Sequence, residues 1–254
     1  FCEDLTRQMT PYMEQWKKRG FIPDGIYTGF LSDEKQADKI LKFMDLFAGE
    51  ETLILTDPVM GDDGEVYPIY TEGLRSRFRE LVSRSYVITP NLTEALLLLY
   101  GKEEMEKKWK VLETMPEAER LEKIQEIGQR LVLEFSLSAV VITGVSYREN
   151  SQTPKMGNLV LEKEKVSWVF AEKSGGSYSG TGDLFASCIA AGAARDMDLG
   201  RAIQLAGTFL EAGLADTVRE KIPRNDGINY EKYLALLIPE EHQQAEKEAD
   251  PHEI

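Results

Sequence analysis

The stretch Ser177-Tyr-Ser-Gly-Thr-Gly-Asp183 combines residues that can bind an anion with one that can accept a proton beside it. Gly180 and Gly182 permit backbone angles that turn consecutive N–H groups toward one point. A helical pattern, 184–194, follows at once, and the free N–H groups and dipole of a helix N-terminus favour an anion. Asp183 would repel a bound phosphate, so it is placed as a base that takes a proton where negative charge is stabilised. The alternative is that Asp183 only caps the helix.

The helical pattern after Gly182 is apolar and rich in small residues on every side. This composition predicts a buried helix, which would hold the anion site rigid. The stretch contains no Gly-Lys-Ser/Thr and is not a P-loop. It also lacks the spacing of a dinucleotide fingerprint after a strand, so NAD binding is not expected.

A second acidic group is Asp57-Pro-Val-Met-Gly-Asp-Asp-Gly64. Asp57 ends an apolar strand pattern, and the turn that follows brings Asp62 and Asp63 near it. In open α/β sheets ligands bind at the carboxyl ends of strands. Magnesium prefers one or two carboxylates together with phosphate oxygens and water, so the group could hold Mg²⁺. The alternative is an acidic turn without function.

Two further strand ends carry polar residues, Thr89-Pro-Asn-Leu-Thr-Glu94 and Thr143-Gly144. Asn91 and Glu94 fit a helix cap, which explains them without any function. With Asp57 close by, Glu94 would be a second carboxylate on the metal side. Thr143 and Gly144 offer a hydroxyl and an open backbone to a phosphate. Together with the Gly180–Asp183 turn, these groups at one sheet edge point to phosphoryl transfer with a metal.

Short apolar strands alternate with helices along the chain, which predicts an α/β fold with a mostly parallel central sheet and helices on both faces. A small β-hairpin is expected at 157–162 and 165–170. Met115-Pro116 should break the charge-rich stretch 102–135 into two solvated helical pieces. The other strands are predicted at 22–30, 52–57, 86–89 and 138–144, and the other helices at 5–20, 36–47, 72–84, 92–100 and 199–218.

The length of 254 residues suits one domain, predicted over residues 1–239, followed by a polar tail at 240–254. The formal net charge of −14 argues against nucleic acid or an anionic membrane as partner. No apolar run reaches the length of a membrane span. The two cysteines form no disulfide framework, which predicts a cytoplasmic protein. Both histidines, His242 and His252, lie in the polar tail, so histidine catalysis is not expected.

Four motifs, in this order and spacing, resemble the pyridoxal/pyridoxamine kinases of the ribokinase-like superfamily. They are Asp57-Pro-Val-Met-Gly-Asp62, Thr89-Pro-Asn-Leu-Thr-Glu94, Val141-Ile-Thr-Gly144 and Gly180-Thr-Gly-Asp183. The resemblance covers the chain from Phe1 to about Leu237. It implies a ribokinase-like fold and ATP-dependent phosphorylation of the 5′-hydroxymethyl group of pyridoxal, pyridoxamine or pyridoxine.

The same resemblance assigns roles to residues. Asp183 is expected to deprotonate the hydroxymethyl group, and the backbone N–H groups of Gly180, Thr181 and Gly182 to stabilise the γ-phosphoryl group. The remaining assignments form three groups: Asp57, Asp62 and Glu94 for magnesium; Asn91, Thr143, Gly144 and Asp62 for the nucleotide phosphates; and Phe30 beside the pyridine ring of the substrate. ATP, Mg²⁺ and a vitamin B6 compound are the implied small molecules, and a homodimer is implied by resemblance.

The chain departs from the family at its start, because family members carry a βαβ-sized piece of about 30 residues or more before the position of Phe1. That piece supplies a central strand and hydroxyl-bearing substrate contacts. Without it the sheet would have an exposed edge. The chain as printed is therefore expected to aggregate, or to bind ATP without turning over pyridoxal, whereas the full-length form is expected to be soluble and active.

Two other functions fit the residues. A hydroxymethylpyrimidine kinase shares the carboxylates and the anion site, although Thr28-Gly-Phe30 and Asn91-Leu-Thr-Glu94 favour vitamin B6. A protein that only binds pyridoxal 5′-phosphate or nucleotide would have no need of Asp183 and the metal-side acids. A sugar kinase fits the Asp57-Pro-Val-Met run poorly.

Overall fold

A computed structural model of the chain describes residues 3–147, 155–162, 165–172 and 178–238. The chain divides into two compact units, Phe1–Phe170 and Ala171–Ile254. The single domain over residues 1–239 stays a prediction, and the predicted polar tail lies outside the described residues.

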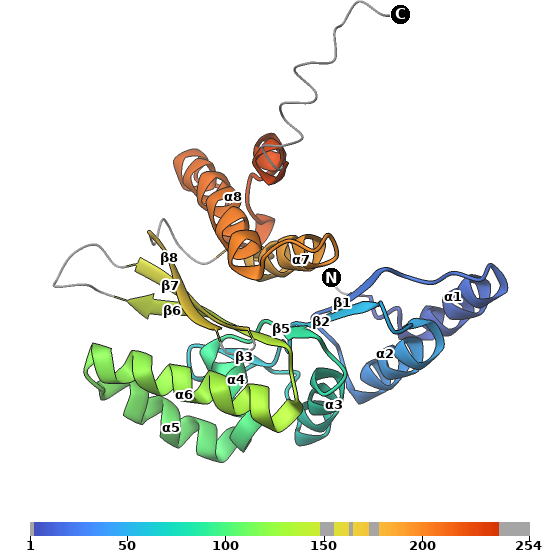
Figure 1. The fold of residues 1–254 in the computed structure, drawn as a ribbon, viewed down its shortest axis with the longest axis horizontal. Helices are drawn as coiled ribbons and strands as arrows, with labels where there is room; N and C mark the ends of the chain where they lie inside the picture. The colour runs from blue at the N-terminus through green and yellow to red at the C-terminus, as the bar shows by residue number, and fades with distance from the viewer. Residues whose placement is uncertain (1–2, 148–154, 163–164, 173–177, 239–254) are drawn as a thin grey trace, which may run out of the picture. The chain divides into compact units, whose positions relative to one another are not determined.

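A six-stranded sheet forms the centre of the first unit (Figure 1). Its strands, in spatial order, are β1 (Gly25–Thr28), β2 (Leu53–Thr56), β5 (Val87–Ile88), β6 (Ala139–Tyr147), β7 (Lys155–Glu162) and β8 (Lys165–Glu172). The first four are parallel to one another, and β7 runs antiparallel to β6. The predicted mostly parallel sheet with a small hairpin is confirmed.

Helices alternate with the parallel strands, as the apolar periodicity predicts. In the first unit they are α1 (Thr6–Lys18), α2 (Glu34–Phe47), α3 (Glu72–Val82), α4 (Leu92–Tyr100), α5 (Lys102–Thr114) and α6 (Glu117–Phe135). Figure 1 shows α3 to α6 on one side of the sheet, where α4 and α6 contact β6. No helix within the described residues combines the length and the apolarity that crossing a membrane requires.

The parallel strands are buried on both faces. Ile54 and Ile88 belong to the main hydrophobic core, which they share with α2, α3, α4 and α6. Leu55 and Val87 alternate with them along the strands and are 0% exposed. Inaccessibility on both faces is the usual condition of a parallel sheet, and it accounts for the continuous apolar runs in these strands.

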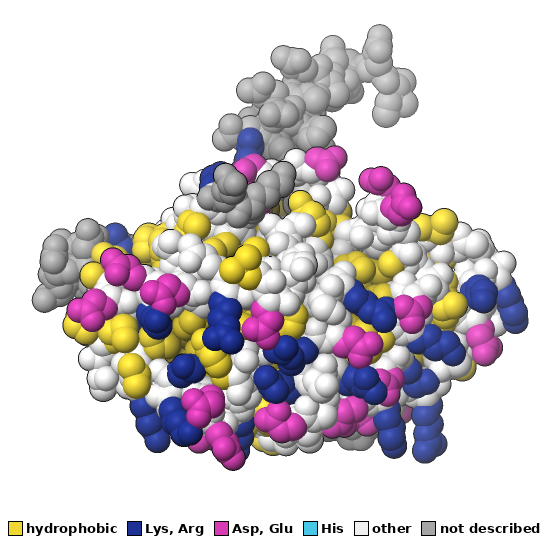
Figure 2. Space-filling model, turned by 60° about the horizontal axis from the view of Figure 1, so that its bottom comes forward, with side chains coloured by type: hydrophobic (Ala, Val, Ile, Leu, Met, Phe, Trp, Pro, Cys, Tyr) yellow, Lys and Arg dark blue, Asp and Glu magenta, His cyan; other side chains and the backbone are white. Residues whose placement is uncertain are grey.

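The charge-rich stretch 102–135 forms α5 and α6, with Met115 and Pro116 between them as predicted. The proline cannot donate a backbone N–H to a continuing helix. Figure 2 shows Lys, Arg, Asp and Glu side chains interspersed on the face of the molecule that it brings forward. Pairs one turn apart, such as Lys107 with Glu104 at 2.6 Å, are of the kind that stabilises exposed helices. The prediction of a solvated helical surface is confirmed.

A two-stranded hairpin follows β2, where the sequence pattern predicts a turn but no strands. Its strands are β3 (Gly61–Asp62) and β4 (Glu65–Val66), paired antiparallel. Asp63 and Gly64 form the turn with φ of 48° and 79°. Positive φ at both central residues is typical of the tight turn whose twist matches a hairpin, which explains the Asp-Gly pair.

Thr143-Gly144 is not the end of a strand, and that prediction is wrong. The parallel pairing of β6 with β5 stops before this point, but β6 continues to Tyr147 beside its antiparallel neighbour β7. The register shifts between Ile142 and Val145, and Gly144 has φ of 70°. Thr143 and Gly144 therefore form a bulge, which bends the strand where the parallel edge ends.

The second unit contains α7 (Thr181–Ala193), α8 (Leu199–Glu220), and the short helices η1 (Arg224–Asp226) and η2 (Glu231–Leu237). The prediction that α7 is buried on every side is wrong, because Ser187 and Ala191 are exposed. Instead, the small residues of α7 allow α8 to pack closely against one side of the helix. A Cβ at Gly192 would lie 2.7 Å from the Cβ of Ala202 in α8.

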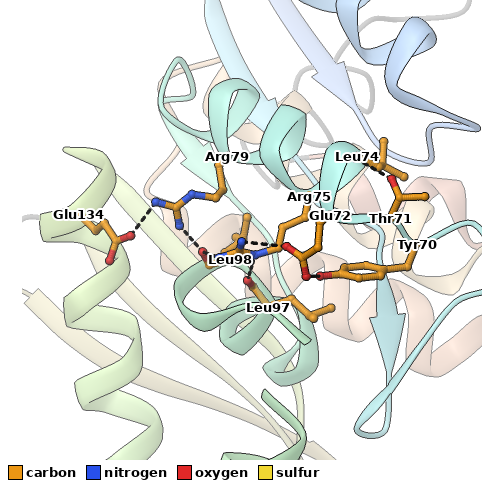
Figure 3. Close-up of polar contacts among 9 residues, drawn as sticks. All are labelled: Tyr70, Thr71, Glu72, Leu74, Arg75, Arg79, Leu97, Leu98 and Glu134. Atoms are coloured by element: carbon orange, nitrogen blue, oxygen red, sulfur yellow. Dashed lines mark hydrogen bonds and ion pairs between the residues drawn. The ribbon is translucent and has the colours of Figure 1, made fainter. Parts of the chain in front are cut away.

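Two arginines of α3 hold the C-terminal end of α4 (Figure 3). Arg75 Nε donates to the carbonyl oxygen of Leu97 at 2.5 Å, and its Nη2 donates to that of Leu98 at 3.2 Å. Arg79 also donates to Leu98 O and pairs with Glu134 of α6 at 2.8 Å. The last carbonyls of a helix lack partners within it. Leu97 O also accepts from Gly101 N at 3.0 Å, so the arginines add a second donor there and supply donors to Leu98 O. They fix the helix whose other end carries Asn91 and Glu94.

We expect Arg75→Met to lower the free energy of unfolding by about 1.5–3 kcal/mol, because a charged donor to two half-buried carbonyls is lost. Arg77→Met is the matched control, since Arg77 pairs with Asp38 on the exposed surface at 2.8 Å. Such pairs contribute about 0.2–1 kcal/mol. Urea denaturation of both variants gives the comparison. An equal loss would show that the contacts to α4 add nothing beyond a surface ion pair.

Candidate active site

The carboxyl ends of β1, β2 and β5 meet at one edge of the sheet. Thr28 pairs with Thr56, and Thr56 with Ile88, so the residues that follow these strands lie at the same level. Asp57 N donates to Thr28 O at 2.8 Å, which fixes the backbone of Asp57 at this edge. The side chain of Asp57 is buried, at 9% exposure. The structure thus places the first predicted metal ligand where the sequence analysis expected it.

Asn91 and Glu94 form a complete capping box at the start of α4. Asn91 Oδ1 accepts from Glu94 N at 3.0 Å, and Glu94 Oε2 accepts from Asn91 N at 2.9 Å. These two bonds satisfy donors that every helix leaves open at its N-terminus. The capping alternative considered from sequence is therefore realised, and any further role must rest on other contacts.

Glu94 makes such a further contact. Its Oε1 accepts from the backbone N of Met60 at 3.2 Å, which ties α4 to the segment between Asp57 and Asp62. The side chain is 3% exposed. Burial, the charge of Asp57 and, to a smaller extent, that of Asp62 raise the pKa of Glu94 well above its ordinary value, against the opposing hydrogen bonds from Asn91 N and Met60 N. Asp57 and Asp62 therefore both lie within electrostatic reach of Glu94.

Excess negative charge at this point suits a cation. Among the described residues, no group of three or more Asp, Glu, His or Cys side chains is arranged to enclose a metal ion. Magnesium does not need such a cage, because it usually takes one or two carboxylates and completes its shell with phosphate oxygens and water. The chemistry of Asp57, Asp62 and Glu94 fits a magnesium ion that arrives with a nucleotide.

We expect Glu94→Gln to raise the magnesium concentration needed for half-maximal turnover, because one negative charge beside the cation is lost. The amide can still accept one of the two backbone hydrogen bonds, so the free energy of unfolding should fall by only about 1–3 kcal/mol. A magnesium titration and a thermal melt of the same preparation measure the two effects.

Glu103→Gln is the control for loss of one carboxylate, since Glu103 lies exposed in α5. It should change neither quantity. A lowered melting temperature with an unchanged magnesium titration would show that Glu94 acts only as a helix cap.

Asn91 and Thr143 come together beside the same edge. An isolated parallel bridge joins the two residues, and Thr143 N donates to Pro90 O at 2.9 Å. Gly144 is exposed, and the nearest heavy atom to a Cβ placed there would be Met156 Sδ at 4.0 Å. The bulge therefore leaves open space beside Gly144, whose N donates to Asn158 Oδ1 at 3.2 Å. The phosphate contacts of Asn91, Thr143 and Gly144 stay a prediction.

Phe30, the predicted ring contact, follows β1 and is 57% exposed. It lines an apolar cavity of ≈ 420 Å³. Aromatic side chains from α1, such as Tyr12 and Trp16, and Phe43 from α2 form part of its wall. Phe30 lies two residues beyond the end of β1, the strand that pairs with β2, which precedes Asp57.

The Gly180–Asp183 turn lies in the second unit. Gly180 is the N-cap of α7 with φ of 80°, so Asp183 is not the capping residue. Thr181 Oγ1 donates to Tyr178 O at 2.9 Å, and Ser179 N donates to Arg224 O at 3.0 Å, which together fix the turn. The first N–H groups of a helix have no acceptor within it.

This turn is open to solvent. Gly180, Gly182 and Asp183 are exposed, and a Cβ at either glycine would meet no heavy atom within 4 Å. Thr181 N donates to Tyr178 O at 3.4 Å. Open space, an exposed glycine backbone and a carboxylate in the first helical turn therefore occur together. These are the features that an anion site with an adjacent base requires.

Thr89 is a further candidate at this edge; it begins the Thr89–Glu94 motif but has no role predicted from sequence. Thr89 follows Ile88 at the level of Asp57 on the neighbouring strand, and its N donates to Thr56 O at 3.1 Å. Its Oγ1 is buried and has no hydrogen-bond partner among the described residues. A buried hydroxyl without a partner is costly, which makes Thr89 a candidate contact for a bound ion or phosphate. The sequence signal that could have identified Thr89 is a hydroxyl residue directly before Pro90, at the end of a strand.

Known proteins resemble this chain in both sequence and fold. A model of the phosphomethylpyrimidine kinase family matches residues 18–225. The pyridoxine/pyridoxal/pyridoxamine kinase of Bordetella avium (strain 197N) is 26% identical over 211 residues, which cover 81% of this chain and 65% of that protein. The chain spans 49% and 65% of the lengths of the curated relatives it matches.

Two solved structures extend the comparison. A provisionally assigned phosphomethylpyrimidine kinase of Bacteroides thetaiotaomicron VPI-5482 has a TM-score of 0.80 and 28% identity, over 93% of this chain and 77% of that chain. An orthorhombic form under the same description contains pyridoxal. The pyridoxal kinase of Staphylococcus aureus, solved with AMP-PCP and pyridoxal, has a TM-score of 0.61 and 19% identity, over 82% of this chain and 66% of that chain. The last likeness shows the fold.

Proposed function

Because the chain belongs to the phosphomethylpyrimidine kinase family, we propose that it transfers the γ-phosphoryl group of ATP to the 5′-hydroxymethyl group of a vitamin B6 compound. The observation that carries the proposal is the first turn of α7. It presents exposed glycine backbone and a carboxylate in open space, at the start of a helix.

In this proposal Asp183 takes the proton of the hydroxymethyl group as its oxygen attacks the γ-phosphorus. The bond from that phosphorus to the β,γ-bridging oxygen breaks, and ADP leaves. The N–H groups of Gly180, Thr181 and Gly182 donate to the phosphoryl oxygens, on which negative charge is spread in the transition state. The residues thus supply the base and the anion site that an alcohol kinase requires.

The nucleotide phosphates would be held at the carboxyl edge of the sheet, by Asn91, Thr143, Gly144 and Asp62. Asp57, Asp62 and Glu94 would hold magnesium, which when bound neutralises charge on the β- and γ-phosphates. A protein with net charge of −14 needs such local compensation to attract ATP. The protein from Staphylococcus aureus, which shares the fold, binds AMP-PCP.

Vitamin B6 is the preferred substrate class because Phe30 offers a flat apolar surface to an aromatic ring. The relative from Bordetella avium is named for the three B6 alcohols, and the Bacteroides thetaiotaomicron protein binds pyridoxal. The second candidate is hydroxymethylpyrimidine, a ring of similar size with the same reacting group. The family description and the assignment of the Bacteroides thetaiotaomicron protein favour it.

The experiment that tests the proposal is a coupled assay of ADP release by the full-length protein, with pyridoxal, pyridoxamine, pyridoxine and hydroxymethylpyrimidine as separate substrates. The expected result is a value of kcat/KM for at least one B6 compound that exceeds the value for hydroxymethylpyrimidine. A higher kcat/KM for hydroxymethylpyrimidine than for every B6 compound would make hydroxymethylpyrimidine the substrate instead. If none of the four compounds causes ADP release, the proposal is contradicted, and a protein that only binds nucleotide or pyridoxal 5′-phosphate is favoured.

A further inference from the structure

The β3–β4 hairpin carries Asp62 but has few contacts of its own. Each strand has two residues, and their only sheet partners within the described residues are each other. An isolated two-stranded hairpin is at best marginally stable in water. The hairpin must therefore be held by side chains outside it.

The first turn of α4 provides one such support. Thr93 Oγ1 accepts from Gly64 N, at the tip of the hairpin, at 2.9 Å. Asn91 Nδ2 donates to Gly61 O, at its base, at 2.8 Å. Thr93 is 1% exposed, so its hydroxyl has no competing contact with bulk water. Hydrogen bonds from the first turn of α4 and its cap therefore hold the hairpin at its tip and at its base.

Trp109 of α5 provides the second support. A Cβ placed on Gly64 would lie 2.5 Å from Trp109 Cδ1 and 2.5 Å from its Nε1, so the backbone of the turn rests directly on the indole ring. Trp109 itself packs against the main hydrophobic core. Glycine at this position is required twice, by its φ of 79° and by the closeness of the ring.

We propose that Thr93 and Trp109 are positioning residues that hold Asp62 in place for magnesium and nucleotide phosphate. The inference rests on the proposed function, in which Asp62 takes part in binding. Asp62 is exposed on the hairpin, and its backbone position is set through Gly64 and Gly61 rather than through the sheet. Loosening the hairpin should weaken nucleotide binding more than it slows phosphoryl transfer.

The test compares Thr93→Val, which keeps the shape but removes the acceptor, with Thr93→Ser, which restores a hydroxyl. Thr93→Val should raise the Kd for ADP with magnesium, and the KM for ATP, by roughly threefold to tenfold, the effect of one hydrogen bond, with kcat nearly unchanged. Thr93→Ser should return both values close to those of the parent. Trp109→Leu should act in the same direction and serves as the second variant if Thr93→Val fails to fold.

Hydrogen exchange at the Gly64 amide separates this inference from the proposed function, because it needs no activity. Exchange should be faster in Thr93→Val and normal in Thr93→Ser. Unchanged exchange, or faster exchange with an unchanged Kd for ADP and magnesium, would overturn the positioning role. If the parent protein shows no kinase activity, the proposed function fails, while the exchange rates and Kd values still decide this inference.

Discussion

Replacing Asp183 by asparagine is expected to lower the rate of phosphorylation by ~10²–10⁴-fold, the usual contribution of a general base. The amide keeps the shape of the carboxylate but cannot accept the proton of the hydroxymethyl group. Asp183 lies exposed in the first turn of α7, where removal of its charge leaves the packing of Phe185 and Ile189 intact. The rate is measured as product formed per enzyme under saturating ATP and substrate.

The affinity for ATP should stay the same or rise slightly, since a negative charge near the γ-phosphate is gone. Calorimetric titration with a non-hydrolysable ATP analogue gives this control. Retention of more than about a tenth of the parent turnover, a loss well short of the range for a general base, would contradict the assignment of Asp183.

Gly182→Ala should also lower the rate of phosphorylation, but by filling space rather than by removing a base. The added methyl group would enter open space, since no heavy atom lies within 4 Å of it, and it would occupy the volume assigned to the phosphoryl group. We expect at least a tenfold loss of turnover, the equivalent of about 1.4 kcal/mol of transition-state stabilisation. Alanine is the better helix former by roughly 0.5–1 kcal/mol, so the melting temperature should stay the same or rise.

Gly207→Ala is the matched control for this variant. Gly207 lies within α8 of the same unit, and a Cβ there also meets no heavy atom within 4 Å. Its melting temperature should respond as that of Gly182→Ala does, while its turnover should equal that of the parent. Full turnover in Gly182→Ala would show that no ligand uses the open space at the start of α7.

The elements around the site could be predicted from sequence because each has a local signal. The apolar strand before Asp57 ends in a turn, and Asn91 with Glu94 is the signature of a capping box, which the structure contains. Pro116 separates two helices as its chemistry requires. These signals depend on neighbours within a few residues, and sequence patterns report them well.

The parts that sequence did not predict depend on distant residues. The β3–β4 strands are too short for any alternation, and the hairpin exists because Thr93 and Trp109 hold it. The sequence pattern predicts a strand end at Gly144, because the continuation of β6 depends on pairing with β7, which no local pattern reports. The exposed side of α7 was missed because small residues fit close helix packing as well as full burial. The roles of Asp183 and the metal-side acids came from residue type and resemblance, and they stay predictions.

The central claim is that Asp183 and the glycine turn transfer the γ-phosphoryl group to a hydroxymethyl oxygen. Its most direct test uses ATP with an isotopic label in the γ-phosphoryl group, together with pyridoxal, and follows the label by mass spectrometry. The account predicts label in pyridoxal 5′-phosphate at the 5′ oxygen, formed by the full-length parent protein and nearly absent with Asp183→Asn in the same protein. Label released only as inorganic phosphate, or equal transfer by Asp183→Asn, would contradict it.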